Sequence, residues 1–495
     1  MEEKEQSNAS ERSETRSQVT GLTVKKSEDF NEWYNQVVLK ADMIDYSLVS
    51  GCIVFKPNSY SIWEKIQEIF DGKIKKSGHK NCYFPMFIPE SLLKKEAEHV
   101  KGFNPEVAWV TRAGNTELNE KLAIRPTSET IMYESYAKWI RSWRDLPLLL
   151  NQWNSVVRWE FKHAKPFLRT REFLWQEGHT VHATKEDAER EVMQQLFEYV
   201  DLIENFMAIP VIAGKKTDKE KFAGADYTKT VEAFMPDGKA LQMGTSHLLG
   251  QNFAKVFGIK FLDKDEKEKY AWQTSWGLST RTIGAIVMAH GDDKGLVLPP
   301  RVAPVQIIII PIVFKENKEK VIEKSKEILK KLKLKSYNVE LDYRDGYTPG
   351  WKFNEWELKG IPLRIEIGPK DVEADQLVLV RRDNNEKQTI KTKDLDKKVE
   401  QTLNDIQDSL FKKAKDYLTK SIVEVHNFND FVNTIKNKKM AKALFCGEDE
   451  CETIIKDKTE GATCRCIPFE QKPAKGHCVQ CGKEAISWAV FGKGY

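Results

Sequence analysis

The sequence predicts an α+β protein of roughly three domains, since a domain commonly holds about 150 residues and the chain has 495. Three features support this organisation. Prolines cluster at 299–304 and separate two long stretches with different residue patterns. Strand-like and helix-like runs alternate after that cluster. Six of the eight cysteines lie between Cys446 and Cys481, close to the C-terminus.

Composition excludes several classes of protein. Hydrophobic residues make up 40% of the chain, and the longest apolar run, 302–314, is interrupted by Pro304 and Pro311. A bilayer-spanning helix needs about 20 apolar residues, so we expect no membrane protein. Residues 1–20 are polar and acidic, which predicts disorder, no secretory signal and a cytosolic location. A net charge of +4 restricts any RNA contact to local basic patches.

The first long stretch, 21–298, is expected to form one mixed domain. Acidic Asp29 precedes Phe30, Trp33 and Val37, whose helical spacing predicts a helix beginning near residue 30. A second amphipathic helix is expected at 185–205, among aromatic-rich segments with strand character.

Residues 303–394 predict a smaller α/β domain, because short apolar strands alternate with helices. The expected elements are strands at 305–310, 341–343, 362–367 and 376–380 and helices at 315–336 and 353–359. A long amphipathic helix is expected at 395–418. It opens a C-terminal domain, 395–495, that carries the cysteine cluster.

A first candidate site segment is 157–177. Alternating apolar and charged residues predict paired strands at 157–161 and 173–175, with Arg158, Glu160 and Glu172 on one face. Taken alone, this pattern also fits a solvated hairpin with surface ion pairs.

A second segment, 276–288, predicts a strand that leads through Arg281 into an apolar helix. Gly277 within the strand would let a flat group approach the backbone. Guanidinium groups bind phosphate oxygens in a fixed fork geometry. Arg158 and Arg281, from separate elements, therefore suit a polyphosphate with an attached base.

Two more segments offer polar groups. In 123–130, Thr127, Ser128 and Glu129 precede a helix expected at 131–143, and capping of that helix is the alternative role for them. The segment 241–247, LQMGTSH, is expected to join a strand to a helix.

With these segments the chain resembles class II aminoacyl-tRNA synthetases, and among them prolyl-tRNA synthetases of the eukaryotic and archaeal type. The similarity runs from about Gly21 to the end. Residues 79–89 (HKNCYFPMFIP) resemble motif 1 and 157–177 resemble motif 2. Residues 276–288 resemble motif 3, and 125–129 (RPTSE) resemble the amino-acid recognition loop.

The resemblance implies an antiparallel-sheet catalytic domain that joins L-proline to tRNA(Pro) through a prolyl-adenylate, with ATP and Mg²⁺ as the nucleotide complex. Such chemistry depends on positioning and positive charge. The family's catalytic arginines fall on Arg158 and Arg281, which would hold the α- and γ-phosphates. The implied ATP-binding residues are Arg158, Glu160, Arg169, Thr170, Gln242, Ser279 and Arg281.

The resemblance also implies a proline pocket and a homodimer formed through motif 1. The implied proline-binding residues are Thr127, Glu129, Arg158, Phe173, Trp175 and His247. A hydrogen-bonded structural role is the alternative for His247. Fewer than 100 residues separate Glu177 from Trp276, so no editing domain is expected between motifs 2 and 3.

Residues 303–394 resemble the family's anticodon-binding domain. The implied anticodon contacts are Glu357, Arg364, Lys370 and Asp371. Arginine and lysine suit the acceptor atoms of guanine, and carboxylates suit its donors. A solvated helix face is the alternative for each residue, and the lysine-rich helix at 315–336 is expected to be solvated.

The cysteines form a CxxxxC and a CxxC pair, Cys446 with Cys451 and Cys478 with Cys481. Thiolates in such pairs suit a closed tetrahedral Zn²⁺ site with a structural role. Cys464 and Cys466 leave the ligand set open, and free thiols in a packed domain are the alternative. The last residue, Tyr495, resembles the family's terminal tyrosine, which reaches toward the catalytic domain.

Other activities fit the sequence less well. Histidyl, threonyl and glycyl synthetases share the scaffold, but no Cys/His triad accompanies the pocket residues as a threonyl enzyme would need. A non-catalytic RNA-binding paralogue would lack Arg158 or Arg281, and both are present. A P-loop or Rossmann-type ligase would need GxxxxGK[ST] or an HIGH and KMSKS pair, and the sequence has neither.

Overall fold

The computed structural model describes residues 21–99, 106–160 and 164–495. Residues 1–20, where the sequence predicts disorder, lie outside the described residues. Every helix in the described ranges is too short or too polar to span a lipid bilayer.

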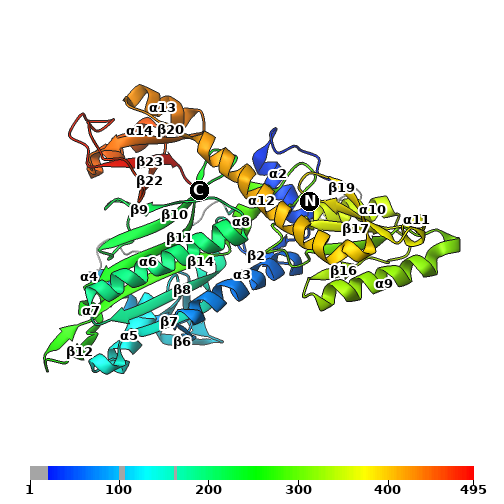
Figure 1. The fold of residues 1–495 in the computed structure, drawn as a ribbon. Coiled ribbons are helices and arrows are strands. Elements are labelled where there is room, and N and C mark those ends of the chain that lie inside the picture. The colour runs from blue at the N-terminus through cyan, green and yellow to red at the C-terminus, as the bar shows by residue number, and fades with distance from the viewer. Residues whose placement is uncertain (1–20, 100–105, 161–163) are drawn as a thin grey trace, which may run out of the picture.

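An eleven-stranded sheet organises the molecule, in the order β20-β21-β23-β22-β9-β10-β11-β14-β8-β7-β3 (Figure 1). Its first-domain strands are β3 (Lys80–Asn81), β7 (Leu148–Val157), β8 (Glu172–His182), β9 (Ile212–Lys215), β10 (Tyr227–Phe234), β11 (Ala240–Gly250) and β14 (Trp272–Ser279). Neighbours from β9 to β7 pair antiparallel. The expected antiparallel α+β catalytic fold is confirmed.

Helices cover this sheet because each carries an apolar stripe. They are α3 (Pro57–Lys76), α6 (Lys185–Asp201) and α8 (Arg281–His290), with the π-helical turn Leu202–Phe206 after α6, and α2 (Phe30–Lys40) packs on α8. Asp29 caps α2 by accepting from the N–H groups of Asn31 and Glu32, as the acidic start predicts. Trp33, Trp63 and Trp276 are buried in the shared core.

Shorter elements complete this part of the chain. A three-stranded sheet contains β4 (Phe87–Pro89), β5 (Trp109–Ala113) and β6 (Thr116–Ile124), and two hairpins pair β1 (Ile44–Tyr46) with β2 (Ile53–Phe55) and β12 (Lys260–Leu262) with β13 (Glu268–Tyr270). The remaining helices are α4 (Glu90–His99), α5 (Glu129–Trp139) and α7 (Asn252–Phe257), with a 3₁₀ turn at Trp143–Asp145. The helix expected at 131–143 is α5, shifted towards the N-terminus.

Residues 307–391 form the predicted α/β layer around a five-stranded sheet of order β16-β15-β17-β18-β19. Its elements are β15 (Ile307–Pro311), α9 (Lys318–Leu334), β16 (Val339–Leu341), α10 (Pro349–Leu358), β17 (Leu363–Ile367), α11 (Pro369–Glu373), β18 (Gln376–Arg381) and β19 (Lys387–Lys391), with 3₁₀ turns at Lys315–Asn317 and Thr392–Asp394. Strand β19 is not among the expected elements, because it lies at the sheet edge with mostly exposed residues and carries no apolar run.

The helix α12 (Leu395–Ser421) runs from this layer to the C-terminal unit (Figure 1). That unit contains β20 (Ile422–Glu424), α13 (Phe428–Lys436), β21 (Met440–Phe445), α14 (Asp449–Lys458), β22 (Ala462–Pro468) and β23 (Ser487–Lys493). Its strand β22 pairs with β9, so the two sheets are continuous. Gly214 permits this junction, because a Cβ there would lie 2.4 Å from the Ile467 carbonyl oxygen.

Two expected segments are wrong in detail. The strand expected at 157–161 ends at Val157, because the Trp159 N–H donates to the Glu106 carbonyl instead of the neighbouring strand. The segment 241–247 does not join a strand to a helix but lies inside β11. Pairing of β11 with both β10 and β14 overrides its turn-like residues, and Gly244 lets Tyr199 pack closely.

Three histidines with lowered pKa values should make stability depend on pH. Burial lowers the pKa of His182 and of His290 to about 4 and that of His247 to about 3. The unfolded chain binds protons near pH 6.5 and the folded chain does not, so stability should fall as pH drops from about 6.5 towards 4. At pH 5 each of these histidines should lower the free energy of unfolding by about 2 kcal/mol. Urea unfolding between pH 7 and 5 measures this slope.

The matched variants are His290→Gln and His426→Gln. The side chain of His426 is 70% exposed, whereas His290 is buried and bonded to the Met207 carbonyl. The His290 variant should lose less stability on acidification than the parent, and the His426 variant should follow the parent. If the free energy of unfolding changed with pH equally in the parent and both variants, His290 would not be the source of the pH dependence.

Candidate active site

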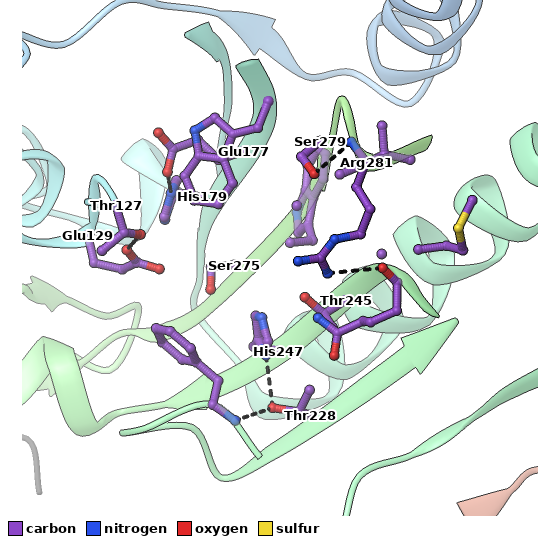
Figure 2. Close-up of a pocket in the computed structure, with 18 of the residues that line it drawn as sticks. Thr127, Glu129, Glu177, His179, Thr228, Thr245, His247, Ser275, Ser279 and Arg281 are labelled. Carbon is purple, nitrogen blue, oxygen red and sulfur yellow. Dashed lines mark hydrogen bonds and ion pairs between the residues drawn. The ribbon is translucent and has the colours of Figure 1, made fainter. Parts of the chain in front are cut away.

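A cavity of about 290 Å³ opens on one face of the large sheet, where β8, β11 and β14 lie side by side (Figure 2). Residues from these strands line it, together with residues from the segment after β7, the start of α5, the loop before β10, β10 itself and the start of α8. The lining residues are Thr127, Glu129, Arg158, Phe173, Trp175, Glu177, His179, Glu220, Phe222, Thr228, Gln242, Met243, Gly244, Thr245, His247, Ser275, Trp276, Gly277, Leu278, Ser279 and Arg281.

One end of the cavity presents a carboxylate and a hydroxyl. Thr127 donates its hydroxyl hydrogen to Glu129, and both side chains are almost fully buried. Figure 2 shows the pair opposite Arg281, with Ser275 between them. A buried carboxylate beside a hydroxyl is suited to a small ammonium group, which can donate to both.

Glu177 and His179 form a buried ion pair behind this end. The His179 Nε2 lies 2.9 Å from Glu177 Oε2, and Ser128 and Asn154 donate to Glu177 Oε1. Burial opposes charge on Glu177, but the hydrogen bond and charge of His179 prevail and lower its pKa. Burial likewise opposes charge on His179. The hydrogen bond from His179 to Glu177 outweighs that effect and raises the pKa of His179. Each group thus favours the charged form of the other.

His247 forms a neutral wall of the cavity. Its Nδ1 lies 2.9 Å from the Thr228 hydroxyl, and its ring packs 4.8 Å from that of Phe222. Burial and the positive His179 lower the pKa of His247 to about 3. His247 can therefore be both a hydrogen-bonded structural residue and a ligand contact, because its bonded ring also lines the cavity.

Two arginines also line the cavity, Arg281 at the end opposite Glu129 and Arg158 beside Pro126. The Arg281 Nη1 donates to the Gln242 carbonyl at 3.2 Å, and the Arg158 Nε donates to the Pro126 carbonyl at 3.0 Å. Within the described chain neither arginine forms a salt bridge, and the Arg281 Nε has no hydrogen-bond partner. Burial and the positive Arg158 lower the pKa of Arg281 to about 10. Half-buried positive charge without a direct salt bridge is suited to an anionic ligand.

The cavity brings together nine of the twelve residues expected to bind ATP or proline. They are Thr127, Glu129, Arg158, Phe173, Trp175, Gln242, His247, Ser279 and Arg281. It does not include Glu160, Arg169 or Thr170. Glu160 is exposed, and the Thr170 hydroxyl donates to the Glu172 carbonyl. Arg169 lines a neighbouring cavity with Lys165 and Tyr495.

Sequence reasoning missed several lining residues, among them Glu177, His179, Phe222, Thr245 and Ser275. Period-two alternation along β8 could have found two of them, since Trp175, Glu177 and His179 share one face of that strand. Phe222 lies in a loop between β9 and β10 and carries no local signal.

The terminal residue packs against the first domain, as expected. The Tyr495 hydroxyl donates to Asp237, and the ring lies 5.2 Å from the Nζ atoms of both Lys165 and Lys239.

The C-terminal cysteines converge as the two pairs predict. The Sγ atoms of Cys446, Cys451, Cys478 and Cys481 lie within 4.8 Å of one another. Cys446 Sγ is 3.5 Å from Cys451 Sγ and 3.8 Å from Cys481 Sγ. A tetrahedral ion with metal–sulfur bonds of about 2.3 Å needs sulfur atoms about 3.8 Å apart, so the cluster fits a metal. Cys464 and Cys466 are buried in β22 and are not part of it.

The four expected anticodon residues fall into two hollows of the α/β layer. Glu357 and Arg364 line one, and Lys370 and Asp371 line the other. Arg364 bonds to Glu366 at 3.0 Å and stacks over Phe353 at 4.2 Å. Asp371 accepts from the Gly368 N–H at the start of α11.

Comparison with known proteins agrees with this layout. Residues 109–290 match the tRNA synthetase class II core domain (G, H, P, S and T), 306–402 an anticodon binding domain, and 428–495 the prolyl-tRNA synthetase C-terminal family. The proline–tRNA ligase of Natranaerobius thermophilus is 55% identical over 92% of this chain and 94% of its own. The chain belongs to the proline–tRNA ligase family. Two further members are proline–tRNA ligase of Ruminiclostridium cellulolyticum (54% identical, covering 95% and 97%) and proline–tRNA ligase 2 of Clostridioides difficile (52%, covering 95% and 97%).

These three members of the proline–tRNA ligase family come from bacteria, and the eukaryotic and archaeal subtype stays a prediction. The whole stretch between Glu177 and Trp276 is described, and it contains α6, α7 and strands β9–β13. This agrees with the prediction that no editing domain is inserted there.

Proposed function

We propose that the described cavity is where this chain joins L-proline to ATP before transferring it to tRNA(Pro). The observation that carries this proposal is one cavity with an acceptor pair, Thr127 and Glu129, at one end and two arginines without a direct salt bridge, of which Arg281 lies at the opposite end. Proline supplies an ammonium for the first end and a carboxylate that must meet a phosphate at the second.

The first step needs no nucleophile from the protein. A proline carboxylate oxygen attacks the α-phosphorus of ATP, the bond to the β-phosphate oxygen breaks, and pyrophosphate leaves. Negative charge builds on the phosphoryl oxygens, and we assign Arg158 and Arg281 to stabilise it. In the second step a ribose hydroxyl of the terminal adenosine attacks the prolyl carbonyl and AMP leaves.

Proline recognition is assigned to the carboxylate end. Thr127 and Glu129 would accept from the secondary ammonium, and Phe173, Trp175 and His247 would enclose the ring. Neutral His247 supports this, because a second positive charge would repel the ammonium.

ATP enters as its Mg²⁺ complex, with the ion held mainly by phosphate oxygens and water. Gln242 and Ser279 line the Arg281 end and are proposed to border the ribose and phosphates. Glu160, Arg169 and Thr170 lie outside the cavity, so we propose that they meet only the outer part of the nucleotide.

Pyrophosphate exchange across the twenty amino acids tests the assignment. Radioactive pyrophosphate should enter ATP only when proline is present, and charging should then require tRNA(Pro). Exchange driven by another amino acid would relocate the specificity within class II, and exchange with none would overturn the proposed function.

We propose the domain limits 21–298 for catalysis, 303–394 for anticodon binding and 395–495 for the C-terminal domain. Arg364 and Lys370 would read guanine acceptors, and Glu357 and Asp371 its donors. Because tRNA charging serves translation, we place the protein in the cytoplasm.

The four-cysteine cluster is proposed to hold Zn²⁺ as a structural ion. Removing the metal by chelation, or replacing Cys481 with serine, should lower the melting temperature by roughly 5–10 °C, because metal binding contributes directly to folding. The initial exchange rate at 20 °C should stay within about twofold, since the cluster lies outside the cavity. Cys52→Ser is the matched control and should change neither. A loss of exchange at unchanged melting temperature would contradict a structural role.

A homodimer through motif 1 is also proposed. Tyr83 and Phe87, both within the motif 1 segment 79–89, are 68% and 41% exposed, an aromatic exposure that dimerisation would cover. Sedimentation at assay concentration should give twice the mass of the chain, and a Tyr83→Glu variant should shift it to the monomer. A monomeric parent would refute the proposal.

A further inference from the structure

A buried ion network joins the C-terminal unit to the phosphate end of the cavity. Glu232 on β10 is 1% exposed, and its Oε1 accepts from Lys216 Nζ and from the Thr230 hydroxyl, each at 2.8 Å. Its Oε2 accepts from Arg465 Nε at 3.1 Å and Nη2 at 2.9 Å. Arg465 lies on β22, so this arginine comes from the far side of the sheet junction.

Glu232 lies on the same sheet face as the cavity. In the β10–β11 register Thr228, Thr230 and Glu232 pair with His247, Thr245 and Gln242, and all three partners line the cavity. Side chains directly opposite each other on antiparallel strands share a face. The Gln242 carbonyl also accepts from Arg281, which brings Glu232 into the neighbourhood of that guanidinium.

The charges at this place do not balance. One carboxylate, Glu232, lies among Lys216, Arg465 and Arg281, and only the first two bond to it. A buried carboxylate attracts the nearest available cation strongly. If Arg465 were absent, Glu232 would lose a two-point partner and Arg281 would be the next guanidinium able to replace it.

The C-terminus closes over Arg465. A Cβ on Gly494 would lie 2.6 Å from Arg465 Nη1, so the glycine lets the terminal segment pack directly on the guanidinium. The Arg465 side chain is only 12% exposed as a result. An arginine this enclosed, bonded to a buried carboxylate beside the cavity, is poorly explained by solubility or surface charge.

We infer that Arg465 is a positioning residue for Arg281: it holds Glu232 together with Lys216 and thereby leaves the Arg281 guanidinium directed into the cavity for the phosphates of the nucleotide. This inference rests on the proposed function, because it assumes that ATP binds at the Arg281 end.

Steady-state pyrophosphate exchange on the full-length protein tests it. Arg465→Met should raise the KM for ATP by about tenfold and leave the KM for proline within about twofold, since only the phosphate end is disturbed. Arg465→Lys keeps the charge but loses the two-point bond. Its KM for ATP should therefore lie between that of the parent and that of Arg465→Met. The lysine variant also serves if the methionine variant does not fold.

Two comparisons separate positioning from a merely loosened junction. Lys219→Met removes bonds from Lys219 to Thr453 and to the Asp449 carbonyl at the same domain junction, and its KM for ATP should stay within about twofold of the parent. Adding Glu232→Gln to Arg465→Met removes the carboxylate that would capture Arg281 and should restore most of the affinity for ATP.

Three results would overturn the inference: an unchanged KM for ATP in both Arg465 variants, an equal rise in Lys219→Met, or no restoration in the double variant. A parent protein without proline-dependent exchange would instead refute the proposed function, so the two failures are distinguishable.

Discussion

Arg281→Ala is expected to reduce proline-dependent pyrophosphate exchange by at least about a thousandfold, and Arg158→Ala by a similar factor. Both guanidinium groups line the cavity without a salt bridge in the described chain, so their charge is available to the nucleotide. The substitutions remove positive charge at the place where negative charge develops in the transition state. Exchange at saturating proline with varied ATP measures the effect.

Arg190→Ala is the matched control for both arginines. Arg190 lies on α6 with a 72% exposed side chain and pairs with Asp187 at the surface. Its exchange rate should equal that of the parent, and circular dichroism should show that all three variants are folded. Near-parental exchange in either cavity variant would mean that the phosphates bind elsewhere.

Glu129→Gln should weaken proline binding by roughly a hundredfold and leave the KM for ATP within about threefold. The amide keeps the shape of the side chain but removes the charge that an ammonium needs, and it places a donor next to the Thr127 hydroxyl. Because Glu129 is buried, solvent screens the lost charge weakly. Proline titration in the exchange assay gives the change in KM.

Glu134→Gln on the same helix provides the comparison. Its carboxylate is 34% exposed and pairs with Lys138 at the surface, away from the cavity lining. This variant should bind proline as the parent does. Equal proline affinity in both variants would show that the ammonium lies elsewhere in the cavity.

The sequence predicts much of this architecture because its local patterns agree with the tertiary fold. The proline cluster at 299–304 marks a true change of layer, and the cysteine pairs converge as their spacing indicates. Gly277 and Arg281 lie on a strand and a helix start as expected. In each case the signal is contained in a few neighbouring residues.

The features that the sequence does not predict depend on contacts between residues far apart in the chain. The turn-like segment around Gly244 is a strand because it is paired on both sides, a fact that only tertiary structure supplies. Phe222 reaches the cavity from a loop, and Glu232 meets Arg465 across 233 positions of sequence. Glu160, expected at the nucleotide, is exposed because the strand ends at Val157.

The hydrogen bonds between β22 and β9 make the C-terminal unit a structural part of the large sheet. Ending the chain at Ser421 would turn β9 into a free sheet edge, with unpaired backbone groups beside Gly214. Such a shortened protein is prone to aggregate through that edge. The last 74 residues, 422–495, therefore protect the edge of the catalytic sheet from pairing with other chains.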